Sequence, residues 1–304
     1  MRNTKALILF SLSTILMFAC EYIITPAPDV TPTSAAAKGW TGTAIKVEKN
    51  AAGGLHVELA IRNETADWSA MDAIAGQPAV LTGADGKSTT CGAVQVSSGG
   101  NRIPPGFQLR GYTAGTKSEP KTQLLNVECQ GVSSAPGMAL KIPYSYVTGP
   151  MNFYVASQAT NATMEINLDK VASDLTYPVS ASGDGEILKL DASIEAINKC
   201  VLTLKDVKRT DTGLEFTWQT ENPGEYPTYV HIGNPPVIGA DGIIYGLYES
   251  PHLADAPITP SGQTAEWTTT VTVPADAKGL YILVPVESKQ QRLFISHAID
   301  ITNK

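Results

Sequence analysis

The sequence lacks the short motifs that mark the common enzyme and metalloprotein classes. It contains no Gly-x-Ser-x-Gly elbow, no His-Glu-x-x-His zinc motif, no glycine-rich phosphate loop and no complete calcium loop. Its four histidines, at positions 56, 231, 252 and 297, do not have the spacing of metal ligands. These absences favour a protein without catalytic activity, cofactor or metal ion. Paired carboxylates that meet only after folding leave a hydrolase as a further alternative.

Charged residues are also few, at 17%, and the acidic ones outnumber the basic ones, which gives a formal net charge of −7. A chain with this balance is not expected to bind nucleic acid or an anionic bilayer surface. The 26 glycines and 20 prolines indicate many turns and short strands rather than long helices. Because single cores rarely extend beyond about 250 residues, the 304 residues suit two sandwich domains. The composition therefore predicts an all-β protein with two cores.

The N-terminus has the pattern of an export signal. Arg2 and Lys5 precede an apolar run over residues 6–18, which is followed by Ala19 and Cys20. The run is shorter than the about 20 residues that a transmembrane helix needs, so we expect cleavage rather than retention as a membrane span. The sequence predicts a signal peptide over residues 1–19.

The end of this run, Leu16-Met17-Phe18-Ala19-Cys20, is similar to the bacterial lipobox. The resemblance implies that Cys20 receives a diacylglycerol, becomes the new N-terminus and anchors the chain to a membrane. The alternative is an ordinary signal peptide with an incidental cysteine. Residues 20–38 then contain Pro26, Pro28 and Pro32 and no hydrophobic face, so they are predicted to form an extended Pro/Thr-rich tether.

One hydrophobic pattern occurs twice in the rest of the chain. Residues 54–61 and residues 213–219 alternate with a period of two, which predicts a half-buried β-strand in each half of the chain. In both copies an asparagine, Asn63 or Asn222, follows where the strand is expected to end. The residues predicted to face inward are Leu55, Val57, Leu59 and Ile61 in the first copy and Leu214, Phe216 and Trp218 in the second.

The correspondence continues downstream. An Asp-Gly turn occurs in both halves, at residues 83–86 and at residues 239–242, and glycine suits such turns because it accepts positive φ. Ile103-Pro104-Pro105-Gly106 corresponds to Ile258-Thr259-Pro260-Ser261-Gly262. We therefore predict one β-sandwich over residues 39–173, a linker over residues 174–192 and a second sandwich over residues 193–304.

This order of lipobox, tether, Gly-Leu hairpin, Asp-Gly turn and Ile-Pro-Pro-Gly resembles the tandem immunoglobulin-like domains of unknown function found in bacterial surface lipoproteins. The resemblance implies two antiparallel immunoglobulin-like β-sandwiches in the bacterial cell envelope, lipid-anchored and extracytoplasmic. It implies no catalytic residues. The first functional hypothesis is a binding or adhesion module for a protein or glycan ligand. The alternatives are a structural spacer or accessory subunit of an envelope complex, and a hydrolase with dispersed carboxylates.

With Cys20 assigned to the lipid, three cysteines remain in an oxidising compartment. Cys91 and Cys129 fall within one predicted domain, so we predict a disulfide between them. Cys200 shares a strand face with leucines, which favours a buried thiol over pairing between chains.

Aromatic residues are concentrated in the second half. Tyrosine offers a broad contact area with one polar tip, so a cluster of tyrosines suits a recognition surface. The alternative is that several of these side chains fill the second core. The candidate binding residues are Tyr226, Tyr229, His231, Tyr245, Tyr248 and His252.

Overall fold

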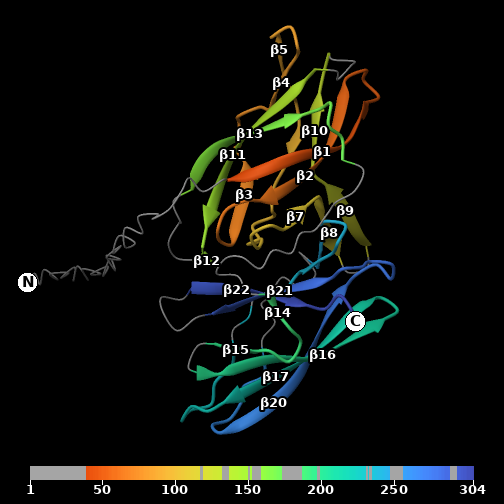
Figure 1. The fold of residues 1–304 in the computed structure, drawn as a ribbon. Coiled ribbons are helices and arrows are strands. Elements are labelled where there is room, and N and C mark those ends of the chain that lie inside the picture. The colour runs from red at the N-terminus through yellow and green to blue at the C-terminus, as the bar shows by residue number, and fades with distance from the viewer. Residues whose placement is uncertain are drawn as a thin grey trace, which may run out of the picture. The chain divides into compact units, whose positions relative to one another are not determined.

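The computed structural model describes residues 39–116, 119–131, 137–149, 151–152, 159–172, 187–196, 199–230, 232, 235–246, 256–287 and 293–304. In these residues the chain forms β-strands and no α-helix, so the all-β prediction is confirmed (Figure 1). The predicted signal peptide, Cys20 and the whole predicted tether lie outside the described residues. The strands pair, mostly antiparallel, into four sheets that form β-sandwiches; the immunoglobulin-like topology stays a prediction.

Two sheets are built from the first half of the chain. Sheet 1 has the strand order β1-β2-β10-β6, with β7 also pairing with β2, and sheet 2 has the order β13-β11-β4-β5, with β3 also pairing with β11. The strands of sheet 1 are β1 (Trp40–Lys49), β2 (Leu55–Asn63), β6 (Val94–Gln95), β7 (Gln108–Leu109) and β10 (Asn126–Cys129). Those of sheet 2 are β3 (Ser69–Ala73), β4 (Val80–Thr82), β5 (Ser88–Thr90), β11 (Ala139–Thr148) and β13 (Thr160–Asn167).

The other two sheets contain the strands of the second half. Sheet 3 has the order β12-β22-β21-β18-β19-β8-β9, with β14 also pairing with β22, and sheet 4 has the order β15-β16-β17-β20. The strands of sheet 3 are β8 (Gly111–Thr116), β9 (Glu119–Leu124), β12 (Met151–Asn152), β14 (Ile187–Leu188), β18 (Val237–Ile238), β19 (Ile243–Tyr245), β21 (Tyr281–Glu287) and β22 (Leu293–Asp300). Those of sheet 4 are β15 (Ser193–Glu195), β16 (Val201–Thr210), β17 (Gly213–Asn222) and β20 (Gln263–Thr272).

The repeated pattern forms the hairpins β1–β2 and β16–β17. All seven side chains predicted to face inward are buried, because alternation places them on the core face of each strand. Both hairpins carry a register shift at corresponding places, between Ala44 and Lys46 and between Leu204 and Asp206. Asn63 and Asn222 end β2 and β17, as the sequence predicted. The shared bulge and the shared strand ends support an internal duplication.

The two Asp-Gly turns also fold alike. Gly86 and Gly242 have φ angles of 77° and 75°, which explains the glycine at each position. In both turns the aspartate carboxylate accepts a hydrogen bond from the backbone N–H two residues on, at 3.1 Å from Asp85 to Lys87 and 3.0 Å from Asp241 to Ile243. The turn prediction is confirmed in both halves.

Buried apolar residues form two clusters, one centred on the first half of the chain and one on the second. Sheet 3 contributes to both. Ile238, Ile244 and Leu283 belong to the first cluster, whereas their neighbours Val237 and Ile282 belong to the second. Successive side chains of a strand point to opposite faces, so sheet 3 is covered by apolar residues on both faces. Residues 37–304 accordingly form one compact unit.

The boundaries of the two predicted sandwiches stay a prediction, but two segments differ from it in pairing. Strands β8 and β9, within residues 39–173, pair into sheet 3 beside β19. Strand β14, within the predicted linker, pairs in parallel with β22. Leu188 and Leu190 pack against the second core, so this end of the predicted linker is apolar enough to join a sheet.

The predicted disulfide is present. Cys91 and Cys129 are bonded, with their Cα atoms 4.1 Å apart, and the bond links the end of β5 to the end of β10. Cys200 is a free and fully buried thiol whose Sγ lies 3.8 Å from Oδ1 of Asn222. Burial raises the pKa of the Cys200 thiol. A thiol without solvent exposure cannot pair with another chain while the fold is intact.

Candidate functional site

Two buried asparagines organise corresponding loops in the two halves. Asn63 donates from Nδ2 to the backbone oxygens of Asp67 at 2.9 Å and Ile103 at 2.8 Å. Asn222 donates in the same way to Tyr226 at 2.9 Å and Thr259 at 2.8 Å. Each asparagine therefore holds two loop segments together at the end of its hairpin.

In the second half this arrangement brings three large hydrophobic side chains to the surface. Tyr226 is 77% exposed, Tyr229 45% and Ile258 69%. Thr228 and Thr259 exchange two backbone hydrogen bonds, at 3.1 and 2.7 Å, which places their neighbours Tyr229 and Ile258 opposite each other on the other side of the pair. The carbonyls of Tyr226 and Thr259 accept from the same Asn222 amide, so Tyr226 lies on the same pair of loop segments as Tyr229 and Ile258. We call these three residues the tip patch.

The first half has different residues at the positions that correspond to the tip patch. Because the bridge between Ser69 and Ile103 corresponds to the bridge between Thr228 and Thr259, the counterparts of the tip patch are Asp67, Ala70 and Arg102. Ala70 and Arg102 are buried, and Nη1 of Arg102 donates to the backbone oxygen of Val147 at 3.2 Å. Burial lowers the pKa of Arg102, which the nearby carboxylate of Asp67 partly opposes. Ala70 and Arg102 are thus buried in the first half, whereas their counterparts Tyr229 and Ile258 are exposed in the second.

The six candidate residues from the sequence have different locations. Tyr226 and Tyr229 lie in the tip patch, whereas Tyr245 is 4% exposed and packs in the second core. Its hydroxyl donates to Oδ2 of Asp241 at 2.5 Å, and burial together with this carboxylate raises the pKa of Tyr245 far above its ordinary value. Tyr245 therefore serves the fold, as the alternative interpretation of the cluster proposed. His231, Tyr248 and His252 lie outside the described residues.

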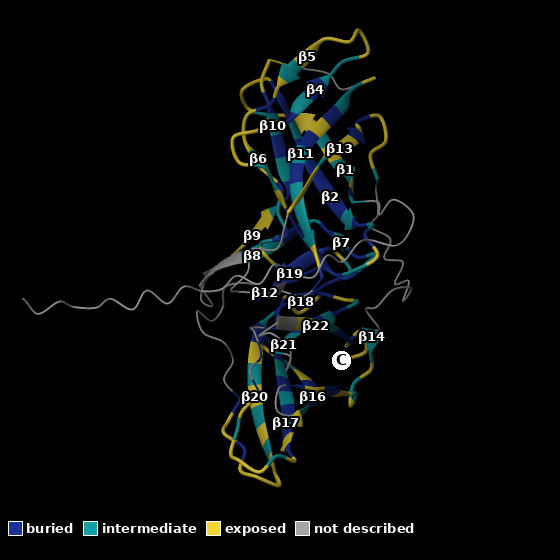
Figure 2. Cartoon of the chain, turned by 90° about the vertical axis from the view of Figure 1, so that its left-hand side faces the viewer, coloured by how far each residue is buried: buried dark blue, intermediate teal, exposed yellow. Residues whose placement is uncertain are grey.

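Sequence reasoning missed Ile258, because it searched for aromatic and ionisable side chains. The sequence match sets Ile258 against Ile103, but the structure shifts this correspondence by one residue. The matching bridges and asparagine contacts set Thr259 against Ile103 and Ile258 against Arg102. An exposed apolar side chain in place of a charged one within a duplicated loop indicates a surface that contacts a partner rather than water alone. Figure 2 shows the chain coloured by burial, with β20, which follows Ile258, largely exposed or intermediate.

No protein-family model and no curated protein matches the sequence. The tip patch is therefore interpreted from its own geometry.

A cluster of charged side chains lies on the outer face of sheet 1. His56 Nδ1 contacts Oε1 of Glu128, while Nδ2 of Asn50 donates to Oε2 of the same carboxylate at 2.9 Å. Glu58 is 8% exposed and accepts from Nη2 of Arg110 at 3.2 Å. Glu128 is thus held in a cross-strand pair with His56, and Glu58 by the guanidinium of Arg110 just after β7.

Burial acts to raise the pKa of Glu128, but the hydrogen bonds from Asn50 and His56 outweigh it and hold the pKa below its ordinary value of 4.5. A carboxyl group with a lowered folded-state pKa stabilises the fold above its unfolded pKa, and this contribution is lost as the pH falls through the folded pKa. We therefore expect Glu128→Gln to flatten the loss of unfolding free energy between about pH 6 and about pH 3. Urea denaturation at a series of pH values measures this slope. Asn50→Ala should flatten it less, and a Glu128→Gln variant with the wild-type slope would contradict the assignment.

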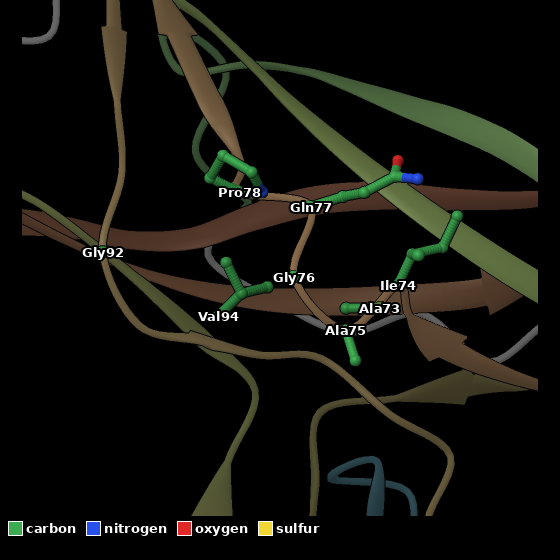
Figure 3. A pocket seen from close by; sticks show the side chains of 8 residues that line it. All are labelled: Ala73, Ile74, Ala75, Gly76, Gln77, Pro78, Gly92 and Val94. Carbon is green, nitrogen blue, oxygen red and sulfur yellow. The ribbon is translucent and has the colours of Figure 1, made fainter.

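A pocket of about 310 Å³ lies beside the loop that joins β3 to β4. Its lining is Ala73, Ile74, Ala75, Gly76, Gln77, Pro78, Gly92 and Val94. Figure 3 shows that Gln77 is the one lining side chain with a hydrogen-bonding group and that its amide points away from Gly92 and Val94. With no ionisable side chain in its lining, the pocket offers no acid, base, nucleophile or metal ligand.

Among the residues that the structure describes, no group of three or more His, Cys, Asp or Glu side chains is placed to hold a metal ion. No helix long and apolar enough to cross a membrane occurs in those parts of the chain either.

Proposed function

We propose that the chain is a lipid-anchored, extracytoplasmic binding module without catalytic activity, which contacts a protein or glycan ligand through the tip patch of its second half. The observation that carries the proposal is the contrast between the halves: Tyr226, Tyr229 and Ile258 are exposed where the first half has Asp67, Ala70 and Arg102. Exposed tyrosines give large contact areas with few rotatable bonds, and an adjacent aliphatic side chain extends the apolar surface.

The contrast also provides the variant that tests the proposal. Tyr226→Asp, Tyr229→Ala and Ile258→Arg together give the second half the residues that the first half has at these positions. Because two of the side chains are more than half exposed and the third nearly so, the fold should be retained. We expect the triple variant to lose affinity by about 30-fold or more, since exposed aromatic anchors carry most of the energy of a contact.

The measurement compares the purified wild type and the triple variant on a glycan array and in pull-downs from a bacterial envelope extract. Ile295→Thr is the matched control, because Ile295 is 42% exposed but lies on β22, outside the tip patch. A ligand captured equally by the wild type and the triple variant would place binding elsewhere. If the wild type captures no ligand in either assay, the spacer function is favoured instead.

The anchor is tested separately. We expect the mature protein to partition into detergent, and Cys20→Ser to release it or to leave the precursor unprocessed, because the thiol would carry the lipid. Triton X-114 partition and mass spectrometry of the N-terminus measure both effects. If the variant stays in the membrane with a normally trimmed N-terminus, the chain is not anchored through Cys20.

A further inference from the structure

The two halves differ in the strand that pairs with the second strand of each hairpin, β2 or β17. In the second half, β20 runs without interruption along β17, with Ala265 opposite Thr220 and Trp267 opposite Trp218. In the first half the corresponding strand is divided. Leu109 stands opposite Ile61, and the backbone oxygen of Leu125 accepts from the N–H of Leu59 at 2.9 Å. Between them, residues 111–124 form the hairpin β8–β9, which has no counterpart in β20; we call it the arm.

The base of the arm is closed and crowded. The N–H of Leu125 donates to the oxygen of Arg110 at 2.8 Å. A Cβ atom at Gly111 would lie 2.4 Å from the backbone oxygen of Gln123, so only glycine fits there. The arm is therefore an insertion with its own defined geometry.

The base of the arm lies on the second half. Strand β8 pairs in parallel with β19, with Gly111 opposite Ile243 and Tyr112 opposite Ile244. The hydroxyl of Thr113 donates to the oxygen of Ile244 at 3.3 Å and accepts from the N–H of Gly246 at 3.2 Å. Tyr112 packs against the first core and Leu124 against the second. The first half thus adds two strands to the sheet of the second half.

The strand that receives the arm is built differently from its counterpart. Strand β5 follows the same Asp-Gly turn in the first half but is formed by Ser88-Thr89-Thr90, which are exposed or intermediate. Strand β19 is Ile243-Ile244-Tyr245, and all three residues are buried. A short polar edge strand such as β5 can remain in contact with water, whereas an apolar edge strand such as β19 is stable only when another segment covers it. The arm covers β19.

From this correspondence we infer that the arm is a β-addition element on which the second half depends: its sheet is completed by a segment encoded in the first half. The second half then keeps its full stability only while the arm is docked on β19. The tip patch also belongs to the second half, and both halves form one compact unit.

The test is an arm deletion in the full chain, with Arg110 joined directly to Leu125. The uninterrupted β20 shows that the scaffold accepts a strand continuous at this place. Hydrogen exchange measured by mass spectrometry should show amides of β18, β19 and β21 exchanging about tenfold faster or more, with amides of β2 and β11 changed by less than about threefold. An equal change in both halves, or none in the second, would overturn the inference.

A point variant keeps the test independent of whether the deletion folds. Thr113→Val retains the arm but removes both hydroxyl hydrogen bonds to the second half, so exchange should accelerate at Gly246 and along β19 alone. Lys121→Ala, at an exposed arm position, is the matched control and should leave exchange on β19 unchanged. Unchanged exchange on β19 in Thr113→Val would show that the arm rests on β19 without stabilising it.

Discussion

Replacement of both Cys91 and Cys129 by alanine is expected to lower the free energy of unfolding of the first half by about 4 kcal/mol. The disulfide closes a loop with a sequence separation of 38, and in the chain-entropy account most of its effect is to restrict the unfolded chain. The bond also links the end of β5 to β10, the strand that follows the arm. Urea denaturation of the wild type and the double variant, followed by circular dichroism, gives the difference directly.

At the position that corresponds to Cys129 of β10, the second half has Val271 on β20 instead of a cysteine. Reduction of the wild type should reproduce the loss seen in the double variant. Cys200→Ala should leave the difference between oxidised and reduced protein intact, since Cys200 is a free thiol. A double variant as stable as the oxidised wild type would contradict the structural role of the bond.

The second large effect is expected at Trp218. This side chain is fully buried, its Nε1 donates to Oγ1 of Thr269 at 2.8 Å, and its ring stacks on Trp267 with centroids 5.8 Å apart. Trp218→Ala removes the largest buried side chain of the second core and leaves a cavity, so we expect a loss of about 3 to 5 kcal/mol. Thermal and urea denaturation measure it.

Trp267→Ala is the matched control for this prediction. Trp267 lies opposite Trp218 on β20 but is only partly buried, so its removal should cost about 1 to 2 kcal/mol. Equal losses in the two variants would mean that Trp218 is not the centre of the second core.

The parts of the fold that sequence predicts well are those whose cause is local. Alternation at Leu214 and Phe216 requires one buried face whatever the partner strand is, and the Asp-Gly turn at Gly242 requires positive φ. The pairing of Cys91 with Cys129 was predicted from the number of cysteines and from the predicted export of the chain, and not from geometry. In each case the residues involved carried the information themselves.

The parts that the sequence could not predict depend on residues far apart in the chain. Nothing in Gly111 or Tyr112 shows that their strand pairs with Ile243 and Ile244, because a strand pattern fixes a buried face and not a partner. Alignment of the two halves would have exposed the arm as unmatched residues 111–124. The counterpart of Ile258 also required the structure, because the sequence match pairs Ile258 with Ile103 and only the bridges at Ile103 and Thr259 show that its counterpart is Arg102.

Separation of Tyr245 from Tyr226 and Tyr229 likewise required the fold. All three have the same side chain, but Tyr245 belongs to a strand of sheet 3 that is covered on both faces. Tyr226 and Tyr229 lie beyond the end of β17, in the loops that Asn222 holds, where no second layer covers them to the same extent.

Hydroxyl-radical footprinting of the protein in intact envelopes and after purification tests directly whether the tip patch binds a ligand. If the tip patch contacts a ligand in its native setting, Tyr226, Tyr229 and Ile258 should be oxidised several-fold less in envelopes than in the purified protein. Val171 and Ile295, which are 49% and 42% exposed outside the patch, should be oxidised to the same extent in both. Equal oxidation of the tip patch in the two samples would contradict a ligand-binding role for these residues.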